Sequence, residues 1–152
     1  MSANHATARL LDDTNRQILS LLQEDARLSY SEIGRRVGLT APAVAERVRR
    51  LEEAGIITGY HAAVDPAALG YPVTVYIHVT ANDGRCDAIR DYATDQPSVT
   101  ECYCVTGGND ILIKGSFESV QALESIVRSL TRYGSVSTSL VLSNYLPHRA
   151  LD

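Results

Sequence analysis

The segment SYSEIGRRVGLTAPAVAERVRRLEEAG, residues 29–55, constrains the fold more than any other part of the chain. Ser29 is followed three residues later by Glu32, which is the signature of a capping box and predicts the start of a helix. Gly38 is typical of the residue that ends a helix, and Thr40 is a favourable N-cap for the next one. The pattern therefore predicts two helices joined by a very short connection.

The second of these helices has two different faces. Val44, Val48 and Leu51 recur at helical spacing and form an apolar stripe. At about 100° per residue, a second stripe points away from the first and carries Ala43, Glu46, Arg47 and Arg50. Two helices joined by a tight turn, the second with an outward basic stripe, predict a helix-turn-helix.

A third helix upstream would complete this domain, because the segment LDDTNRQILSLLQEDARL has apolar residues at helical spacing and Asp12 or Asp13 placed to cap it. Downstream, Ile56–Val64 is expected to form an extended segment or a small hairpin. The glycine and proline residues that follow it mark a hinge before the next domain. The predicted organisation is a flexible tail (1–10), a winged-helix-like helix-turn-helix domain (11–60), a hinge (61–72), a second domain (73–146) and a C-terminal tail (147–152).

The charge pattern indicates a nucleic-acid partner for the helix-turn-helix. The whole chain is acidic, with a formal net charge of −4. Residues 27–50 nevertheless hold six arginines against two glutamates. Nucleic-acid binding needs a local basic patch rather than a basic protein, so the sequence is compatible with DNA binding.

The types of residue on the second helix suit the major groove. Arginine can bridge guanine O6 and N7, alanine can touch the thymine methyl group, and Glu46 can accept from cytosine N4. Arginines on the preceding helix are placed to contact the phosphate backbone. The predicted DNA-binding residues are Arg35, Arg36, Thr40, Ala41, Ala43, Glu46, Arg47 and Arg50. Two alternatives remain open: a solvated surface helix, and a small-molecule-sensing module whose helix-turn-helix docks a protein partner.

The C-terminal half alternates strand and helix patterns. PVTVYIHVT places Val73, Val75, Ile77 and Val79 on one face of a strand, and GRCDAIRDYATD reads as a short helix. SVTECYCVT and ILIKGSF flank GGND as a hairpin. A helix follows, closed by Gly134 and predicted to bury Val120, Leu123, Val127 and Leu130, and SVSTSLVLS is the last strand. The order βαββαβ predicts a ferredoxin-like domain, and the chain as a whole an α+β protein.

The second face of this sheet is expected to be an interface. Both helices must cover one face, which leaves Tyr76, His78 and apolar or cysteine side chains on the other. Uncovered patches of that kind usually mark interfaces. We therefore expect a symmetric homodimer, which also suits a helix-turn-helix reading paired half-sites.

The chain resembles the Lrp/AsnC (feast/famine) family of bacterial and archaeal transcriptional regulators. The resemblance rests on LDDTNRQILSLLQEDAR, IGRRVGLTAPAVAERVRRLEEAGIITGY, VDPAALG and CYCVTGGNDILIK, in that order over nearly the whole chain. It implies a dimer that binds double-stranded DNA, often assembled into octameric discs or open helical arrays. It also implies that the C-terminal effector domain binds an amino acid or related small molecule where dimers meet.

The resemblance implies an effector site at a glycine-rich turn. The family's Val-Thr-Gly-x-x-Asp turn corresponds to Val105, Thr106, Gly107, Gly108, Asn109 and Asp110, with Thr138 and Ser139 as further candidates. Asp110 offers a carboxylate to an α-ammonium group, while free amides in the turn can take an α-carboxylate. Many relatives have an acidic or aromatic residue where this chain has Gly108 and Asn109. From the residues alone, a hairpin turn with Asp110 bonded to nearby backbone explains the same pattern.

Other classes of function have no support in the sequence. There is no Walker A motif, no Gly-x-Ser-x-Gly elbow and no paired His/Glu metal helix, so we expect neither an enzyme nor a resident cofactor or metal. The spacing of Cys102 and Cys104 does not suit structural zinc. Three cysteines without framework spacing fit a reducing cytoplasm. No segment is apolar enough for a membrane helix.

Overall fold

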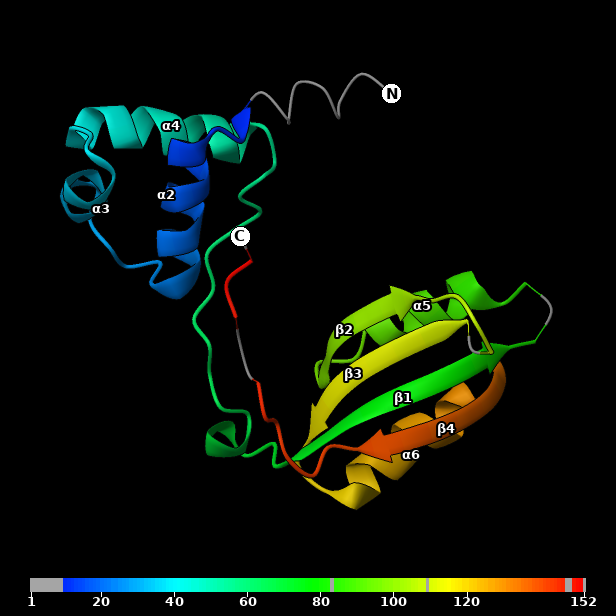
Figure 1. The fold of residues 1–152 in the computed structure, drawn as a ribbon. Coiled ribbons are helices and arrows are strands. Elements are labelled where there is room, and N and C mark those ends of the chain that lie inside the picture. Colours follow the sequence, from blue (N-terminus) through cyan, green and yellow to red (C-terminus); the bar gives the residue numbers. More distant parts are fainter. Residues whose placement is uncertain (1–9, 83, 109, 147–148, 152) are drawn as a thin grey trace. The chain divides into compact units, whose positions relative to one another are not determined.

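The computed structural model describes residues 10–82, 84–108, 110–146 and 149–151. The chain forms two compact units, coloured along the sequence in Figure 1. One comprises the described residues of 1–62 together with those of 145–152, and the other those of 63–144.

The first unit contains three helices that begin and end where local signals predict. They are α2 (Asp13–Glu24), α3 (Tyr30–Val37) and α4 (Ala41–Glu53). The Asp12 side chain caps α2, and Ser29 and Glu32 form the predicted capping box of α3. Gly38 ends α3 with φ 72°, a left-handed conformation that costs glycine little. Thr40 occupies the N-cap position of α4 as expected, but within the described chain its side chain makes no capping hydrogen bond.

The core of the first unit lies where these helices meet. It is built from fully buried Ile18, Ile33, Val44 and Val48. Gly34 is also buried, and a Cβ there would clash with the backbone carbonyl of Leu39. The missing side chain lets the turn between α3 and α4 fold back closely on α3. The apolar stripe predicted for α4 is therefore confirmed as its buried face.

The segment that follows α4 and the segment near the C-terminus are irregular. Residues 54–72, all of which the structure describes, contain a short 3-10 helix, η1 (Ala67–Leu69), and no strand. The small hairpin considered for Ile56–Val64 is therefore not formed. Near the C-terminus, the backbone of Leu151 and the side chain of Gln23 exchange two hydrogen bonds, of 2.9 and 3.0 Å.

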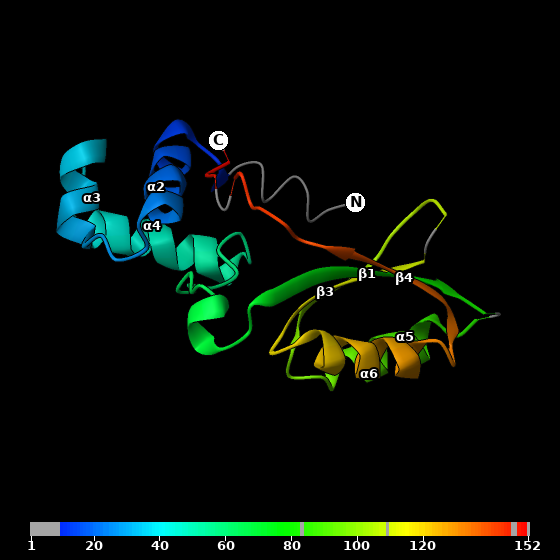
Figure 2. The same cartoon turned by 90° about the horizontal axis from the view of Figure 1, so that it is seen from below.

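The second unit is a four-stranded antiparallel sheet with two helices. Its elements are β1 (Val73–Ala81), α5 (Cys86–Thr94), β2 (Val99–Cys104), β3 (Ile111–Phe117), α6 (Val120–Leu130) and β4 (Gly134–Leu140). The strand order is β2-β3-β1-β4, and α5 and α6 lie on one face of the sheet (Figure 2). No element of this unit that the structure describes covers the opposite face. The predicted ferredoxin-like, α+β architecture is confirmed.

The sheet and its helices enclose a second core. Alternate residues of β1 (Val75, Ile77 and Val79) are buried in it, as the strand pattern predicts. The prediction of which residues of α6 are buried is partly wrong. Ile126 and Leu130 are buried, whereas Val120 is 62% exposed. The sheet buries the residues of α6 that face it, and Val120, in the first turn of the helix, is not among them.

Gly134 was expected to close α6, and this expectation is also wrong. The helix ends at Leu130, and Gly134 is the first residue of β4, paired with Ala81 of β1. A Cβ at Gly134 would clash with the backbone carbonyl of Thr80. Glycine is therefore needed here because two backbones approach closely, rather than because a helix ends.

Candidate DNA-binding and effector sites

The outward face of α4 carries most of the predicted DNA-binding residues. Thr40 and Arg50 are exposed there, while Ala41 and Ala43 are half-buried and keep the start of the helix free of bulky side chains. On the neighbouring helix α3, Arg35 and Arg36 are exposed in the last turn.

Glu46 lies at the centre of this face and binds two arginines of its own helix. Its carboxylate accepts from Arg49 Nη2 at 2.8 Å and from Arg50 Nε at 2.8 Å. Arg49 also pairs with Glu53. Hydrogen bonds from Arg49 and then Arg50 hold the pKa of Glu46 below its ordinary value, so this carboxylate is ionised at neutral pH. Its acceptor capacity for cytosine is therefore shared with two guanidinium groups.

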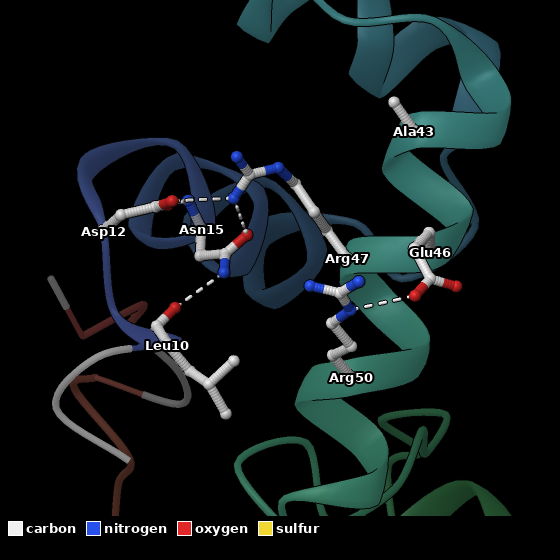
Figure 3. A pocket seen from close by; sticks show the side chains of 7 residues that line it. All are labelled: Leu10, Asp12, Asn15, Ala43, Glu46, Arg47 and Arg50. Atoms are coloured by element: carbon white, nitrogen blue, oxygen red, sulfur yellow. Dashed lines mark hydrogen bonds and ion pairs between the residues drawn. The ribbon is translucent and has the colours of Figure 1, made fainter. Parts of the chain in front are cut away.

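Arg47 lies on the same stripe but bonds to another helix. Its Nη1 donates to Asp12 Oδ2 at 2.8 Å and to Asn15 Oδ1 at 2.9 Å. Its side chain is 33% exposed, against 60% for Arg50. Arg47 and its two partners line a cleft of about 330 Å³, shown in Figure 3, whose full lining is Leu10, Asp12, Asn15, Ala43, Glu46, Arg47 and Arg50.

Sequence reasoning missed Asp12 and Asn15 as neighbours of the basic stripe. Asn15 is only 4% exposed, and its Nδ2 donates to the carbonyl of Leu10 at 2.6 Å. The hydrogen bond from Arg47 and the backbone N–H of Asn15 lower the pKa of Asp12. The sequence offers Asp12 or Asp13 as the cap of α2, but no spacing rule connects Asp12 to an arginine 35 residues away.

The predicted effector turn is tied to the end of β1 through Asp110. The backbone N–H of Ala81 donates to Asp110 Oδ2 at 2.7 Å, and the backbone N–H of Asp110 donates to the Val79 carbonyl at 3.0 Å. The hairpin turn itself is closed by the Val105 N–H, which donates to the Asp110 carbonyl at 3.0 Å, whereas the bond of the Asp110 side chain reaches Ala81, 29 residues away on β1. Around it, Thr106, Gly107 and Gly108 are exposed, Val105 is half-buried and Asn109 lies outside the described residues. Gly107 has φ 113°, a conformation that favours glycine.

The two candidate residues on β4 lie apart from this turn within one chain. Thr138 is paired with Ile77 and Ser139 with Tyr76, so their side chains point to opposite faces of the sheet. The strand position opposite Ala81 is Gly134. Ser139 is therefore displaced by five residues, or about 17 Å, along the strand from the end that holds the turn.

The uncovered face of the sheet carries a polar cluster on the edge strand β2 and its neighbour β3. Lys114 Nζ binds Glu101 Oε1 at 2.8 Å, and the Tyr103 hydroxyl donates to Glu101 Oε2 at 2.6 Å. Hydrogen bonds from Lys114 and then Tyr103 lower the pKa of Glu101. His78 lies on the same face, with Nε2 3.5 Å from Ser139 Oγ.

The expectation that cysteines would lie on this face is wrong for β2. Cys102 is paired with Ile113 and Cys104 with Ile111, both of which point toward the helices. Burial raises the pKa of the Cys102 thiol, whereas Cys104 is exposed. A register irregularity between Val99 and Glu101 fixes which residues of β2 face each way. No group of metal-binding side chains occurs in the part of the chain that the structure describes.

Comparison with known proteins agrees with this architecture. The AsnC-type helix-turn-helix domain matches residues 11–52, and the Lrp/AsnC ligand binding domain matches residues 74–151. The chain belongs to the Lrp/AsnC family. Its members are helix-turn-helix transcriptional regulators that carry a ligand-binding domain, rather than enzymes. No helix in the described ranges is long and apolar enough to cross a bilayer.

Individual relatives cover almost the whole chain. The HTH-type transcriptional regulator YezC of Bacillus subtilis is 39% identical over 92% of this chain and 99% of its own. The structure of LrpC from the same organism has a TM-score of 0.83 and 33% identity, covering 88% of this chain and 96% of that one. A transcriptional regulator of Neisseria meningitidis, NMB0573, solved as an L-Met complex, has a TM-score of 0.86 and 26% identity, covering 93% and 96%.

Proposed function

We propose that this protein is a sequence-specific DNA-binding transcriptional regulator that inserts α4 into the major groove of double-stranded DNA. The observation that carries the proposal is the division of α4 into two faces. Val44, Val48 and Leu51 are completely buried on one face, while Arg50 is 60% exposed on the other. An α-helix with an outward cationic face fits the major groove. Because such a regulator acts on the chromosome of a bacterium or archaeon, we place it in the cytoplasm.

The start of α4 suits close approach to the DNA backbone. Ala41 and Ala43 are small, and Thr40 is exposed at the N-cap. The first amides of a helix favour phosphate through their free N–H groups and the helix dipole. Arg35 and Arg36 on α3 would add phosphate contacts that orient the protein without reading sequence.

Retention of genomic fragments tests the DNA-binding proposal. The pure protein is incubated with sheared genomic DNA from its source, and the retained fragments are sequenced for wild type and for Arg50→Gln. Arg128→Gln is the matched control, because Arg128 also pairs with a glutamate four residues earlier, Glu124, but lies on α6. We expect discrete enriched fragments with wild type and Arg128→Gln, and weak enrichment with Arg50→Gln. A protein that enriches no fragment, yet loses a co-purifying protein partner on Arg50→Gln, would instead be a protein-docking module.

The second part of the proposal is that the C-terminal domain binds an amino acid or a related small molecule. The match to a ligand-binding domain supports it, as does the structural similarity to a regulator solved with L-Met. We assign the site to the turn of residues 105–110, with Ser139 and Thr138 as weaker candidates. Because Ser139 is about 17 Å from this turn along its own strand, a shared site would need a second copy of the chain.

A thermal-shift panel of the common amino acids tests the effector. Asp110→Asn removes the carboxylate charge but keeps an oxygen that can accept from the Ala81 N–H. We expect at least one amino acid to raise the Tm of wild type and to lose this effect with Asp110→Asn. Asp95→Asn, which removes a charge just beyond α5, is the control. No shift across the panel would contradict the effector proposal and leave the DNA-binding proposal intact.

We further propose that the effector acts by changing assembly. The uncovered sheet face, with His78 and the Lys114–Glu101 pair, is the surface we assign to a homodimer, which would assemble further to a higher oligomer such as an octamer. A ligand can shift this equilibrium only through different affinities for the two states. Light scattering on a sizing column should show a change in mass when the active amino acid is added, and an unchanged mass would contradict this mechanism.

A further inference from the structure

The two arginines on the outward stripe of α4 are held in different ways. Arg47 bonds to α2, through Asp12 at its N-cap and Asn15 in its first turn. Arg50 bonds through Nε to Glu46, on its own helix. Figure 3 shows Arg47 bonded to Asp12 and Asn15, and Arg50 bonded to Glu46. Arg47 therefore constrains how α4 lies against α2, whereas the Arg50 pair does not.

The partners of Arg47 are themselves committed. Asp12 Oδ1 accepts from the backbone N–H of Asn15 at 2.7 Å while Oδ2 accepts from Arg47, so one carboxylate caps α2 and holds α4. Asn15 is almost completely buried and donates to the Leu10 carbonyl. If Arg47 moved to a phosphate, the Asn15 oxygen would lose its donor in a buried place, which is costly.

Arg50 has no such constraint. Its side chain is 60% exposed, and no described residue bonds to either of its terminal nitrogens. Its bond to Glu46 joins residues four apart on a helix surface, an arrangement that stabilises little and exchanges easily. A backbone phosphate can therefore bind its guanidinium without disturbing the packing of the unit.

We propose that Arg47 is a positioning residue that locks the recognition helix α4 onto the N-terminus of α2, and that Arg50 is the stripe arginine that contacts the duplex. This inference rests on the proposed function. It revises the sequence-based expectation that both arginines supply DNA affinity in the same way. The Asp12–Arg47–Asn15 network sets the angle at which α4 enters the groove, and Arg50 supplies the charge.

Salt-dependent binding separates the two roles. Fluorescence anisotropy with a retained fragment is measured over a range of salt concentrations, because the slope counts phosphate contacts at about 0.9 per contact. Arg50→Gln should lower the slope by about 0.9 per bound subunit and leave Tm unchanged. Arg47→Gln should weaken binding by about tenfold through misplacement of α4, with the wild-type slope, and lower Tm by about 5 °C.

Asp12→Asn gives the sharpest comparison because it leaves both arginines in place. Asparagine is an equally good N-cap, so α2 keeps its cap while Arg47 loses its charged partner. The control is Asp13→Asn, which removes the same charge one residue later, at a carboxylate without a described bond to Arg47. Asp12→Asn should weaken DNA binding although it removes a negative charge, and Asp13→Asn should not. The double variant Asp12→Asn with Arg47→Gln should be no worse than the worse single variant.

The opposite results would overturn the inference. Arg47→Gln would then lower the slope as Arg50→Gln does, with an unchanged Tm, and Asp12→Asn would tighten binding as much as Asp13→Asn. If the wild-type protein bound no DNA fragment at all, the proposed function would fail. The Tm values of the variants would then be the only test of the positioning role. Equal, non-additive losses of Tm for Asp12→Asn and Arg47→Gln would support it, and unchanged Tm values would refute it.

Discussion

Gly34→Ala tests the geometry of the turn that presents α4. In an unobstructed helix this change stabilises by about 1 kcal/mol. Here the new methyl group would clash with the Leu39 carbonyl, and overpacking of this kind costs about 1–3 kcal/mol. The neighbour is backbone, and relief would also strain the hydrogen bond from Leu39 N–H to the Gly34 carbonyl, at 2.9 Å, worth about 1 kcal/mol. We therefore expect a net loss of about 1–3 kcal/mol.

Thermal unfolding of the full chain, with hydrogen exchange in α3 and α4, measures this effect. For a unit of this size each kcal/mol lowers Tm by about 4–8 °C, and exchange should accelerate at the Leu39 amide. Ser31→Ala is the control, since Ser31 is exposed on the same helix and its replacement should be close to neutral. If Gly34→Ala instead stabilised the protein by about 1 kcal/mol, as in an open helix, the close approach of the turn to α3 would be refuted.

Three further predictions concern the second unit. Ile126→Ala should lower the free energy of unfolding in urea by about 2–5 kcal/mol, and Val120→Ala by less than about 0.5 kcal/mol. The reason is that Ile126 is 8% exposed and Val120 62% exposed. Equal losses would contradict the packing of α6. Lys114 lowers the pKa of Glu101 from its ordinary 4.5, so this carboxylate stabilises the fold above about pH 4.5 and the contribution is lost as pH falls through its lower folded pKa. Both partners are about one third exposed, so Glu101→Gln should reduce the fall of Tm at acid pH only slightly. This variant should lower Tm more at pH 7 than at pH 3, and a larger loss at pH 3 would refute the prediction. A thiol reagent should modify exposed Cys104 first and Cys102 slowly, because burial raises the Cys102 pKa; Cys104→Ser should abolish the fast phase, and its survival would contradict the register of β2.

The boundaries of α3 could be predicted because their determinants are local. The capping box of Ser29 and Glu32 and the left-handed Gly38 involve residues within a few positions of each other. The same holds for the alternation of β1, where the strand itself decides which residues point inward.

Features set by contacts between elements could not be predicted in this way. The spacing of α6 allows several apolar stripes, and only its position over the sheet selects Ile126 over Val120. The bond from Arg47 to Asp12 depends on how α4 crosses α2, which neither segment encodes alone. At the 105–110 turn, the sequence left two roles for Asp110, and the bond from Ala81 appears only when β1 ends beside it.

Hydrogen exchange of the full-length protein, with and without a retained DNA fragment, tests the central claim most directly. We predict that DNA protects the amides of residues 38–51, with the largest change at the start of α4, where free N–H groups face the backbone phosphates. Protection confined to the sheet of residues 73–140, with 38–51 unchanged, would contradict the claim that α4 is the surface that meets DNA.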